Sequence, residues 1–227
     1  MAPGQARIGI VCGLVAERET LGPLLDHPRV AVAVSGARPA LAETEAAALA
    51  EAGCDVLVSY GLAGGLAPGL TPGTLIWPRH VVSESGEDWT MEDVAAATAA
   101  SRTGRTVERL LGLERVAVMV SEKQALAAAS GAAAVDMESH RVARVAAARG
   151  RRTIAWRAIG DPASRALPAL AANAVRRDGR PDIPSVLLGL LRRPLDLPKL
   201  MAAKRDSDAA LTALAASVPL LRDHLEL

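Results

Sequence analysis

Aromatic residues are scarce in this chain: its 227 residues include three Trp, one Tyr and no Phe, although half of all residues are apolar. We therefore expect a mainly aliphatic core. Four aromatic side chains are too few for the stacking platforms that bind single-stranded nucleic acid. An excess of one charge is also absent, with 26 basic against 25 acidic residues, so no net field attracts a polyanion. No nucleic acid partner is expected.

Cysteines and long hydrophobic runs are few as well. Cys12 and Cys54 lie in apolar runs and lack the spacing of a metal site or a disulfide framework, which favours a reducing cytoplasm. No apolar run reaches the ~18 to 20 residues of a membrane span. The first residues also lack the cationic and apolar regions of a signal peptide. We expect a cytoplasmic protein.

The pattern along the chain alternates between apolar runs of strand length and Ala-rich stretches of helical period, which is typical of a sheet flanked by helices. We predict one α/β domain over 1–227 with a mixed, twisted central sheet. The predicted helices 40–53 and 138–150 end at glycines, where a helix C-cap belongs. The predicted strands are 7–13, 29–34, 55–60, 74–82, 115–120, 132–136 and 153–159.

Two segments depart from this alternation. Residues 83–104 are polar and then rich in small residues, as an insertion or lid would be. Residues 183–227 form a predicted helical C-terminal extension. Pro181 precedes it, and prolines at 184, 194 and 198 separate short helices before a longer one from about Ser207.

A glycine-rich stretch, GLAGGLAPG at 61–69, directly follows the predicted strand 55–60. Glycines at this place let backbone N–H groups approach an anion or a sugar hydroxyl closely. The stretch is neither the dinucleotide fingerprint GxGxxG nor a P-loop. A tight turn from strand to helix is the simpler interpretation.

Carboxylates stand at three predicted strand ends. In AVDMESH, Asp136 and Glu138 suit the binding of vicinal hydroxyls, although Asp136 could equally be a helix N-cap. In AWRAIGDPAS, Asp161 suits a general acid or a turn aspartate. In IGIVCGLVAERETL, Glu17 follows the first strand beside Arg18, which alone would indicate a solvated helix start.

Together, the order and spacing of these four motifs resemble the nucleoside phosphorylase and nucleosidase superfamily from Ile8 to about Ser164. The resemblance implies that Glu138 and Asp136 bind the ribose hydroxyls and that Met137 packs against the sugar. It further implies that Asp161 protonates the departing purine and that Glu17 activates water. A glycosidic bond that breaks with positive charge on the sugar and negative charge on the base needs such groups.

Other positions carry over less directly. A phosphate or nucleophile pocket would involve Gly36, Arg38, Gly64 and Gly65, and the purine would lie near Ala125 and Leu126. Leu62 stands where the nucleosidases usually have Ser, and Ala125 and Leu126 stand where the family often has an aromatic residue. Trp89 is a candidate for stacking on the base.

A narrower resemblance, to the hopanoid-associated phosphorylases, is based on VDMESH with His140, on RAIGDPASRALP and on the tail LLRRPLDLPKLMAAKRDSDAALTAL. It implies release of adenine from adenosylhopane. Residues 184–205 combine leucines with basic residues, which favours either peripheral contact with an anionic inner membrane or packing within the protein.

The sequence thus predicts an enzyme, a nucleoside phosphorylase or purine nucleosidase, which acts on a 5′-substituted adenosine. A methylthioadenosine/S-adenosylhomocysteine nucleosidase and a non-catalytic nucleoside-binding protein are the alternatives. We expect no metal or organic cofactor, because His27, His80, His140 and His224 lack ligand spacing. Inorganic phosphate is a possible co-substrate, and a homo-oligomer, preferably a dimer, is expected.

Overall fold

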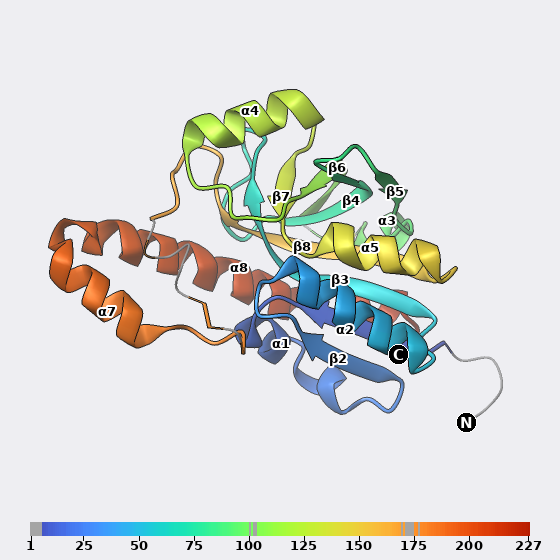
Figure 1. The fold of residues 1–227 in the computed structure, drawn as a ribbon. Helices are drawn as coiled ribbons and strands as arrows, with labels where there is room; N and C mark the ends of the chain where they lie inside the picture. Colours follow the sequence, from blue (N-terminus) through green and yellow to red (C-terminus); the bar gives the residue numbers. More distant parts are fainter. Residues whose placement is uncertain (1–5, 100, 102–103, 169, 171–174, 177) are drawn as a thin grey trace.

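The computed structural model describes residues 6–99, 101, 104–168, 170, 175–176 and 178–227. Figure 1 shows a sheet with helices on both sides and a pair of helices that extends away from it. Within the described part, no helix has both the length and the hydropathy needed to cross a membrane.

Eight strands form one mixed sheet in the order β2-β1-β3-β7-β6-β4-β5, with β8 paired to both β3 and β4. Five of them, β3, β7, β6, β4 and β8, therefore close a ring of strand pairs. The long strands β3 and β8 run parallel, with a shift of register between Ala63 and Gly64. The strands are β1 (Ile8–Cys12), β2 (Val30–Val34), β3 (Val56–Gly65), β4 (Leu75–Ser83), β5 (Asp88–Thr90), β6 (Gly104–Gly112), β7 (Ala134–Asp136) and β8 (Arg152–Asp161).

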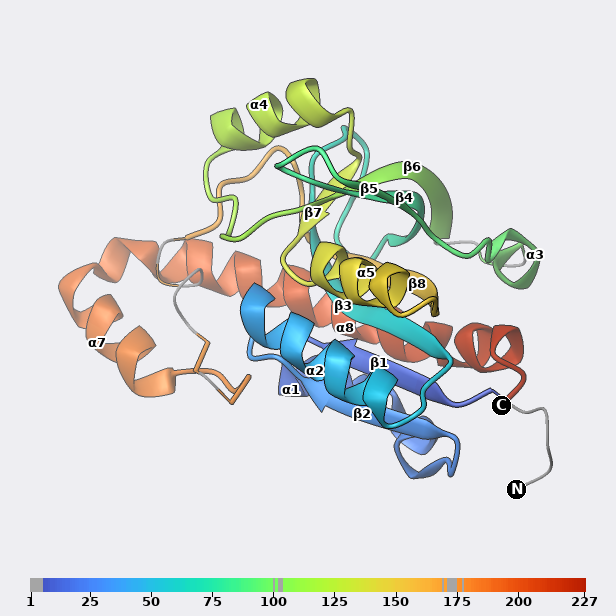
Figure 2. The same ribbon diagram turned by 45° about the vertical axis from the view of Figure 1, so that its right-hand side comes forward.

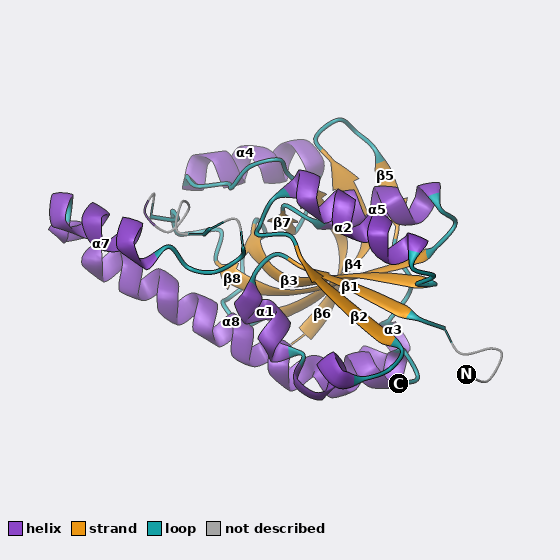
Figure 3. Cartoon of the chain, turned by 60° about the horizontal axis from the view of Figure 1, so that its bottom comes forward, coloured by secondary structure: helices purple, strands orange, loops and turns teal. Residues whose placement is uncertain are grey.

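Helices cover both faces of this sheet, as Figure 3 shows, with α2 and α5 on one face and α8 on the other. The α-helices are α1 (Val15–Thr20), α2 (Pro39–Glu51), α3 (Ala95–Thr98), α4 (Val120–Ser130), α5 (Ser139–Ala148), α7 (Ile183–Arg192) and α8 (Leu197–His224). Two short 3-10 helices, η1 (Gly22–Asp26) and η2 (Pro194–Asp196), complete the set.

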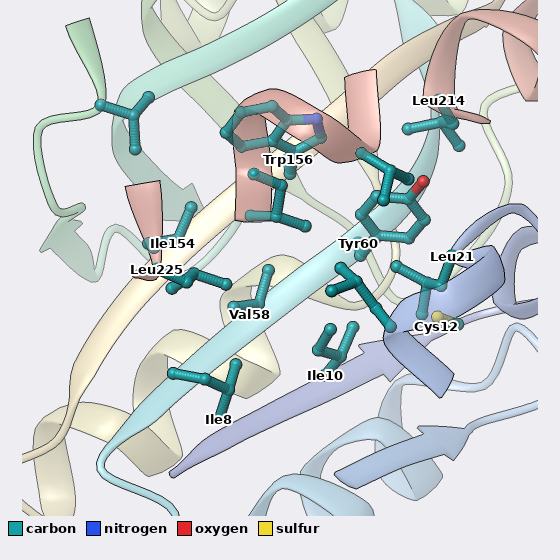
Figure 4. Packing of buried hydrophobic residues seen from close by; sticks show 14 of the residues in the cluster. Ile8, Ile10, Cys12, Leu21, Val58, Tyr60, Ile154, Trp156, Leu214 and Leu225 are labelled. Atoms are coloured by element: carbon teal, nitrogen blue, oxygen red, sulfur yellow. The ribbon is translucent and has the colours of Figure 1, made fainter. Parts of the chain in front are cut away.

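The main core lies between the sheet and α8 (Figure 4) and is mostly aliphatic, as expected. Three of the four aromatic residues also lie in it. The rings of Trp77 and Trp156 meet edge to face, 5.3 Å apart. Trp156 donates a hydrogen bond to Ser217 of α8 (2.9 Å). Helix α8 is therefore an integral part of the core.

Most predicted elements are confirmed, including the helices that end before Gly53 and Gly150, both of which have positive φ. The strand predicted at 115–120 is wrong: these residues lead into α4, and the strand is β6, which the charged residues of GRTVERLLG obscured. Residues 83–104 include β5 and α3. The last helix begins at Leu197 because Pro198 lies in its first turn, where proline is tolerated.

Candidate functional site

Glu17 lies in α1, and its carboxylate is buried. One carboxylate oxygen accepts the N–H groups of Gly13 and Leu14, and the other accepts that of Leu62, all at 2.8 Å. Burial raises the pKa of Glu17, while Arg157 and the three amides act against this rise. Gly61 is required beside it, because a Cβ there would lie 2.5 Å from the carboxylate. The fold thus fixes Glu17 between β1 and β3.

Asp136, at the end of β7, belongs to a buried polar network. Its Oδ2 lies 2.5 Å from Nη2 of Arg157, a β8 residue whose side chain has no exposed surface. Ser139 donates to the same carboxylate from its backbone N–H and from its hydroxyl (2.5 Å). Arg157 also donates to the hydroxyl of Ser59 (2.5 Å). Asp136 is therefore held by several protein groups.

Glu138 lies next to this network but is less fully engaged. Its Oε2 is 3.5 Å from Nη2 of Arg157. Burial raises the pKa of Glu138 to about 8; Arg157 opposes the rise, and Asp136 and Glu17 add to it. Glu138 and Glu17 border the same backbone atom, because a Cβ on Gly13 would lie 2.8 Å from one carboxylate and 3.3 Å from the other. The structure thus brings the two predicted glutamates together.

Asp161 is the last residue of β8. The pairing of β3 with both β8 and β7 places it in the same region as Asp136. Gly64 of β3 pairs with both Asp161 and Val135, the residue before Asp136. A Cβ on Gly64 would lie 3.2 Å from Oδ1 of Asp161, so the glycine leaves space beside that oxygen. The ammonium of Lys123 contacts Oδ2. Burial raises the pKa of Asp161, and Lys123 acts in the opposite direction.

The glycines of the expected nucleophile pocket take two different conformations. Gly64 and Gly65 belong to β3, so the stretch after Tyr60 continues as a strand and does not turn into a helix. Gly36 has positive φ and precedes Arg38, the N-cap of α2, in a loop joined to Gly13 by an Ala37 N–H bond to its carbonyl (2.9 Å). Gly36 and Arg38 are thus close to the Glu17 loop.

The predicted purine-binding residues lie on α4. Ala125 is exposed, while Leu126 packs against a small apolar cluster. Met137 separates Asp136 from Glu138 and is half-buried. Trp89 lies on the edge strand β5, where the guanidinium of Arg144 covers its ring at 5.8 Å. A groove of about 470 Å³ also lies there, and none of its lining residues is among the predicted catalytic or ribose-binding residues.

Two cations of this region were missed by sequence reasoning. Arg157 interrupts the apolar run IAWRAIG, and a charge inside a buried strand is the signal that could have identified it. Lys123 lies in an Ala-rich helix whose pattern gives no comparable signal. Among the described residues, no three His, Cys, Asp or Glu side chains are grouped as a metal site.

Comparison with known families places a match in the first half of the chain. The model of the phosphorylase superfamily matches residues 15–94, a stretch that includes Glu17 and the glycine motif. Asp136, Glu138 and Asp161 lie outside it. No protein of curated function matches the sequence.

Solved structures match over nearly the full length. A Helicobacter pylori 5′-methylthioadenosine/S-adenosylhomocysteine nucleosidase in complex with an inhibitor has a TM-score of 0.69 at 16% identity, with 98% of this chain and 99% of that chain covered. Futalosine hydrolase of Helicobacter pylori strain 26695 has a TM-score of 0.69 at 16% identity, with 97% of each chain covered.

A third match is the S-adenosylhomocysteine nucleosidase of Streptococcus pyogenes, with a TM-score of 0.63, 17% identity, and 95% of this chain and 99% of that chain covered. The α/β fold predicted from the sequence is thus that of these nucleosidases. Fold and family match together confirm the resemblance to the phosphorylase superfamily, and they support the prediction of a nucleoside phosphorylase or nucleosidase.

Proposed function

We propose that this protein cleaves the N-glycosidic bond of a 5′-substituted adenosine and releases adenine. The observation that carries this proposal is the placement of the carboxylates. Glu17 and Glu138 both border Gly13, and Asp136 and Asp161 end the strands that flank Gly64. Four carboxylates from three distant segments are thus held at one region of the sheet.

The charges suit the transition state of such a cleavage. Three buried carboxylates, on Glu17, Asp136 and Glu138, share one guanidinium. Those of these groups that are ionised stabilise a sugar that becomes cationic. Arg157 and Ser139 hold Asp136, which leaves Glu138 available to accept ribose hydroxyls. Asp161, whose raised pKa favours the protonated form, donates a proton to the departing purine.

Water is the nucleophile that this site favours. Glu17 is buried with a raised pKa, which suits a general base. A phosphate dianion would be repelled by the three carboxylates. Arg38 beside Gly36 is the cation that would support phosphorolysis, with inorganic phosphate as co-substrate. Adenine release that requires phosphate and yields ribose 1-phosphate ends would contradict hydrolysis.

We propose adenosylhopane as the substrate, because the sequence resembles the hopanoid-associated phosphorylases. Soluble methylthioadenosine or S-adenosylhomocysteine is the second candidate, because solved structures with this fold include nucleosidases for these compounds. Adenosine, methylthioadenosine and an adenosine with a long 5′ alkyl group should be compared, each with and without phosphate. Preference for the alkyl substrate would support the first assignment, and preference for methylthioadenosine the second.

A surface at the tail supports a lipid-linked substrate. The α7–α8 hairpin, residues 183–205, extends away from the sheet (Figure 1, Figure 2). Leu191 and Leu195 are 82% and 88% exposed. The hairpin begins near the site, since the carbonyl of Gly179 accepts the N–H of Val15 (3.1 Å). Exposed basic side chains adjoin the leucines: Arg192, Arg193, Lys199, Lys204 and Arg205. We propose a cytoplasmic dimer that rests on an anionic inner membrane through this hairpin.

Liposome flotation tests the membrane contact. Wild type should float with vesicles that contain anionic lipid, and the Arg192→Glu/Arg193→Glu variant should float less, because each basic residue near such a surface contributes about 1 kcal/mol. The control is Arg79→Glu/Arg109→Glu, two exposed positions on other elements. Equal flotation of both variants would contradict the contact. Concentration-dependent self-association without flotation would assign the hairpin to a subunit interface.

The acid is tested by Asp161→Asn, which keeps shape and removes the proton donor. Adenine release should fall by about 10²- to 10⁴-fold, while binding of a nucleoside analogue changes little. Asp26→Asn, at an exposed position, is the control and should leave both unchanged. Persistence of adenine release in Asp161→Asn would remove Asp161 from the proposed role.

A further inference from the structure

Lys123 is placed where a cation is unfavourable on two grounds. Its side chain has no exposed surface, and burial of a charge is costly unless the charge is paired and hydrogen-bonded. It also lies in the first turn of α4, which begins at Val120. The N-terminal end of a helix carries partial positive charge, so it disfavours cations. Lysine here needs a compensating partner.

The partners are three oxygen atoms that follow β8 in sequence. The ammonium contacts Oδ2 of Asp161 and donates to the carbonyls of Pro162 and Arg165, both at 3.0 Å. An ammonium has three N–H donors, so each has an acceptor. This geometry fixes the Asp161 carboxyl by one oxygen. The other oxygen, Oδ1, lies beside Gly64, which has no side chain of its own, and near Cγ1 of Val135.

We propose, on the premise of the proposed function, that Lys123 is a positioning residue: it holds Asp161 with Oδ1 toward the departing purine and stabilises the carboxylate left after proton donation. In that step the glycosidic C–N bond breaks with its electron pair on the base. The O–H proton of Asp161 moves to a purine nitrogen, and water adds to the sugar carbon and releases a proton to Glu17. Lys123 keeps its own protons throughout.

A side chain that held Asp161 only by shape or by uncharged hydrogen bonds would not lower the pKa of its carboxyl through charge. Lys123 lowers the pKa of this carboxyl against the effect of burial. Its removal should therefore raise the pKa and keep the acid protonated to higher pH. The charged groups around Asp161 also include Arg165, which lowers its pKa, and Asp206 of α8, which raises it. Both remain in place in the variant.

The experiment compares the pH profile of kcat/KM in wild type, Lys123→Met and Lys123→Arg. In Lys123→Met the rate should fall by about tenfold to a hundredfold, and the alkaline limb should move upward by about 1 pH unit or more. Lys123→Arg retains the charge, so its limb should stay near that of wild type. Arg79→Met, which alters an exposed cation of β4, is the control. An unmoved limb in an active Lys123→Met protein would overturn the proposal.

A second measurement does not depend on turnover. The Asp161 carboxyl can be titrated by ¹³C NMR, assigned by loss of its signal in Asp161→Asn, in wild type and in Lys123→Met. If Lys123→Met does not fold, Lys123→Gln takes its place, because it loses the charge and keeps two N–H donors. An upward move of the titration supports the proposal, and coincident titrations refute it. Absence of adenine release from the wild type would contradict the proposed function and leave this titration as the deciding test.

Discussion

Two buried cations, Arg157 and Lys123, lie in the same region but differ in the charge around them. Arg157 is shared by the carboxyl groups of Asp136, Glu138 and Glu17, so acidic groups outnumber cations around it. Lys123 pairs with one carboxylate, Asp161, and its other two partners are uncharged carbonyls. Acidic groups outnumber cations at the first centre and equal them in number at the second.

This difference matches the two halves of a glycosidic cleavage. The sugar becomes positive, so it is stabilised beside the centre with excess carboxylate. The base becomes negative and needs a proton, which a balanced acid–cation pair supplies without repelling the product. Under the proposed function, the ratio of carboxyl groups to cations, more than the presence of either, distinguishes the sugar side of the site from the base side.

The largest effect should come from removal of the cation that serves several carboxylates. Arg157→Met leaves Asp136 and Glu138 buried without a counter-charge, and the expected loss of unfolding free energy is about 3 to 5 kcal/mol. Urea unfolding at neutral pH measures it. Arg79→Met, at an exposed position, should change stability by less than about 0.5 kcal/mol. A loss in Arg157→Met no larger than in Lys123→Met would erase the difference between the two centres.

The next effect concerns Glu17, the proposed general base on the sugar side. Both oxygens of Glu17 accept backbone N–H groups, so the amide of Glu17→Gln places a donor against at least one of them. We expect adenine release to fall by about 10²- to 10⁴-fold, with about 1 to 3 kcal/mol lost in stability. Glu19→Gln, exposed on the same helix, is the control. Full activity in a folded Glu17→Gln protein would contradict the assigned base.

The smallest expected effect is the pH dependence of stability that Glu138 causes at the Arg157 centre. The pKa of Glu138 rises from 4.5 to about 8 on folding. Between these values the native state binds more protons than the unfolded state, so stability falls as pH rises. Glu138→Gln imitates the neutral acid and should escape this loss.

Thermal unfolding of wild type and Glu138→Gln at pH 5 and pH 9 measures the effect. At pH 9 the Tm of the variant, relative to that of wild type, should rise by about 2 to 4 °C for each kcal/mol of unfolding free energy that wild type loses. If Glu138 is already ionised in the native protein at pH 5, the difference between variant and wild type should not change between pH 5 and pH 9. Glu45→Gln, on α2, is a matched control whose difference from wild type should be the same at both pH values.

Much of the candidate site could be predicted from the sequence, because its carboxylates lie at or shortly after strand ends. The apolar runs before Glu17, Asp136 and Asp161 identify β1, β7 and β8, and residues that follow neighbouring strands meet at one region. The two cations escaped prediction for different reasons. Arg157 was given no role, although the strand that contains it was predicted. The ammonium of Lys123 finds its carbonyl partners on residues 162–165, and hydrophobic periodicity does not reveal the path of that segment.

The remaining differences also have physical causes. Strand β6 lies between β7 and β4, but it carries Arg105, Glu108 and Arg109, so its apolar pattern is weaker than that of the fully buried strands. The C-terminal helix was expected to start near Ser207, because the prolines before it indicate breaks. Its inward residues Ala210, Leu214 and Leu221 nevertheless make it part of the core.

The ring of strands has a consequence for how the protein is made. Val56 of β3 pairs with Arg152 of β8, nearly a hundred residues later in the chain. Such distant pairing slows folding, because the entropy of loop closure is lost before the contacts form. During synthesis, Glu17 emerges long before Arg157 and Asp161, so a nascent chain that ends before β8 holds no complete site. The enzyme would become active only after its last strand has closed the ring.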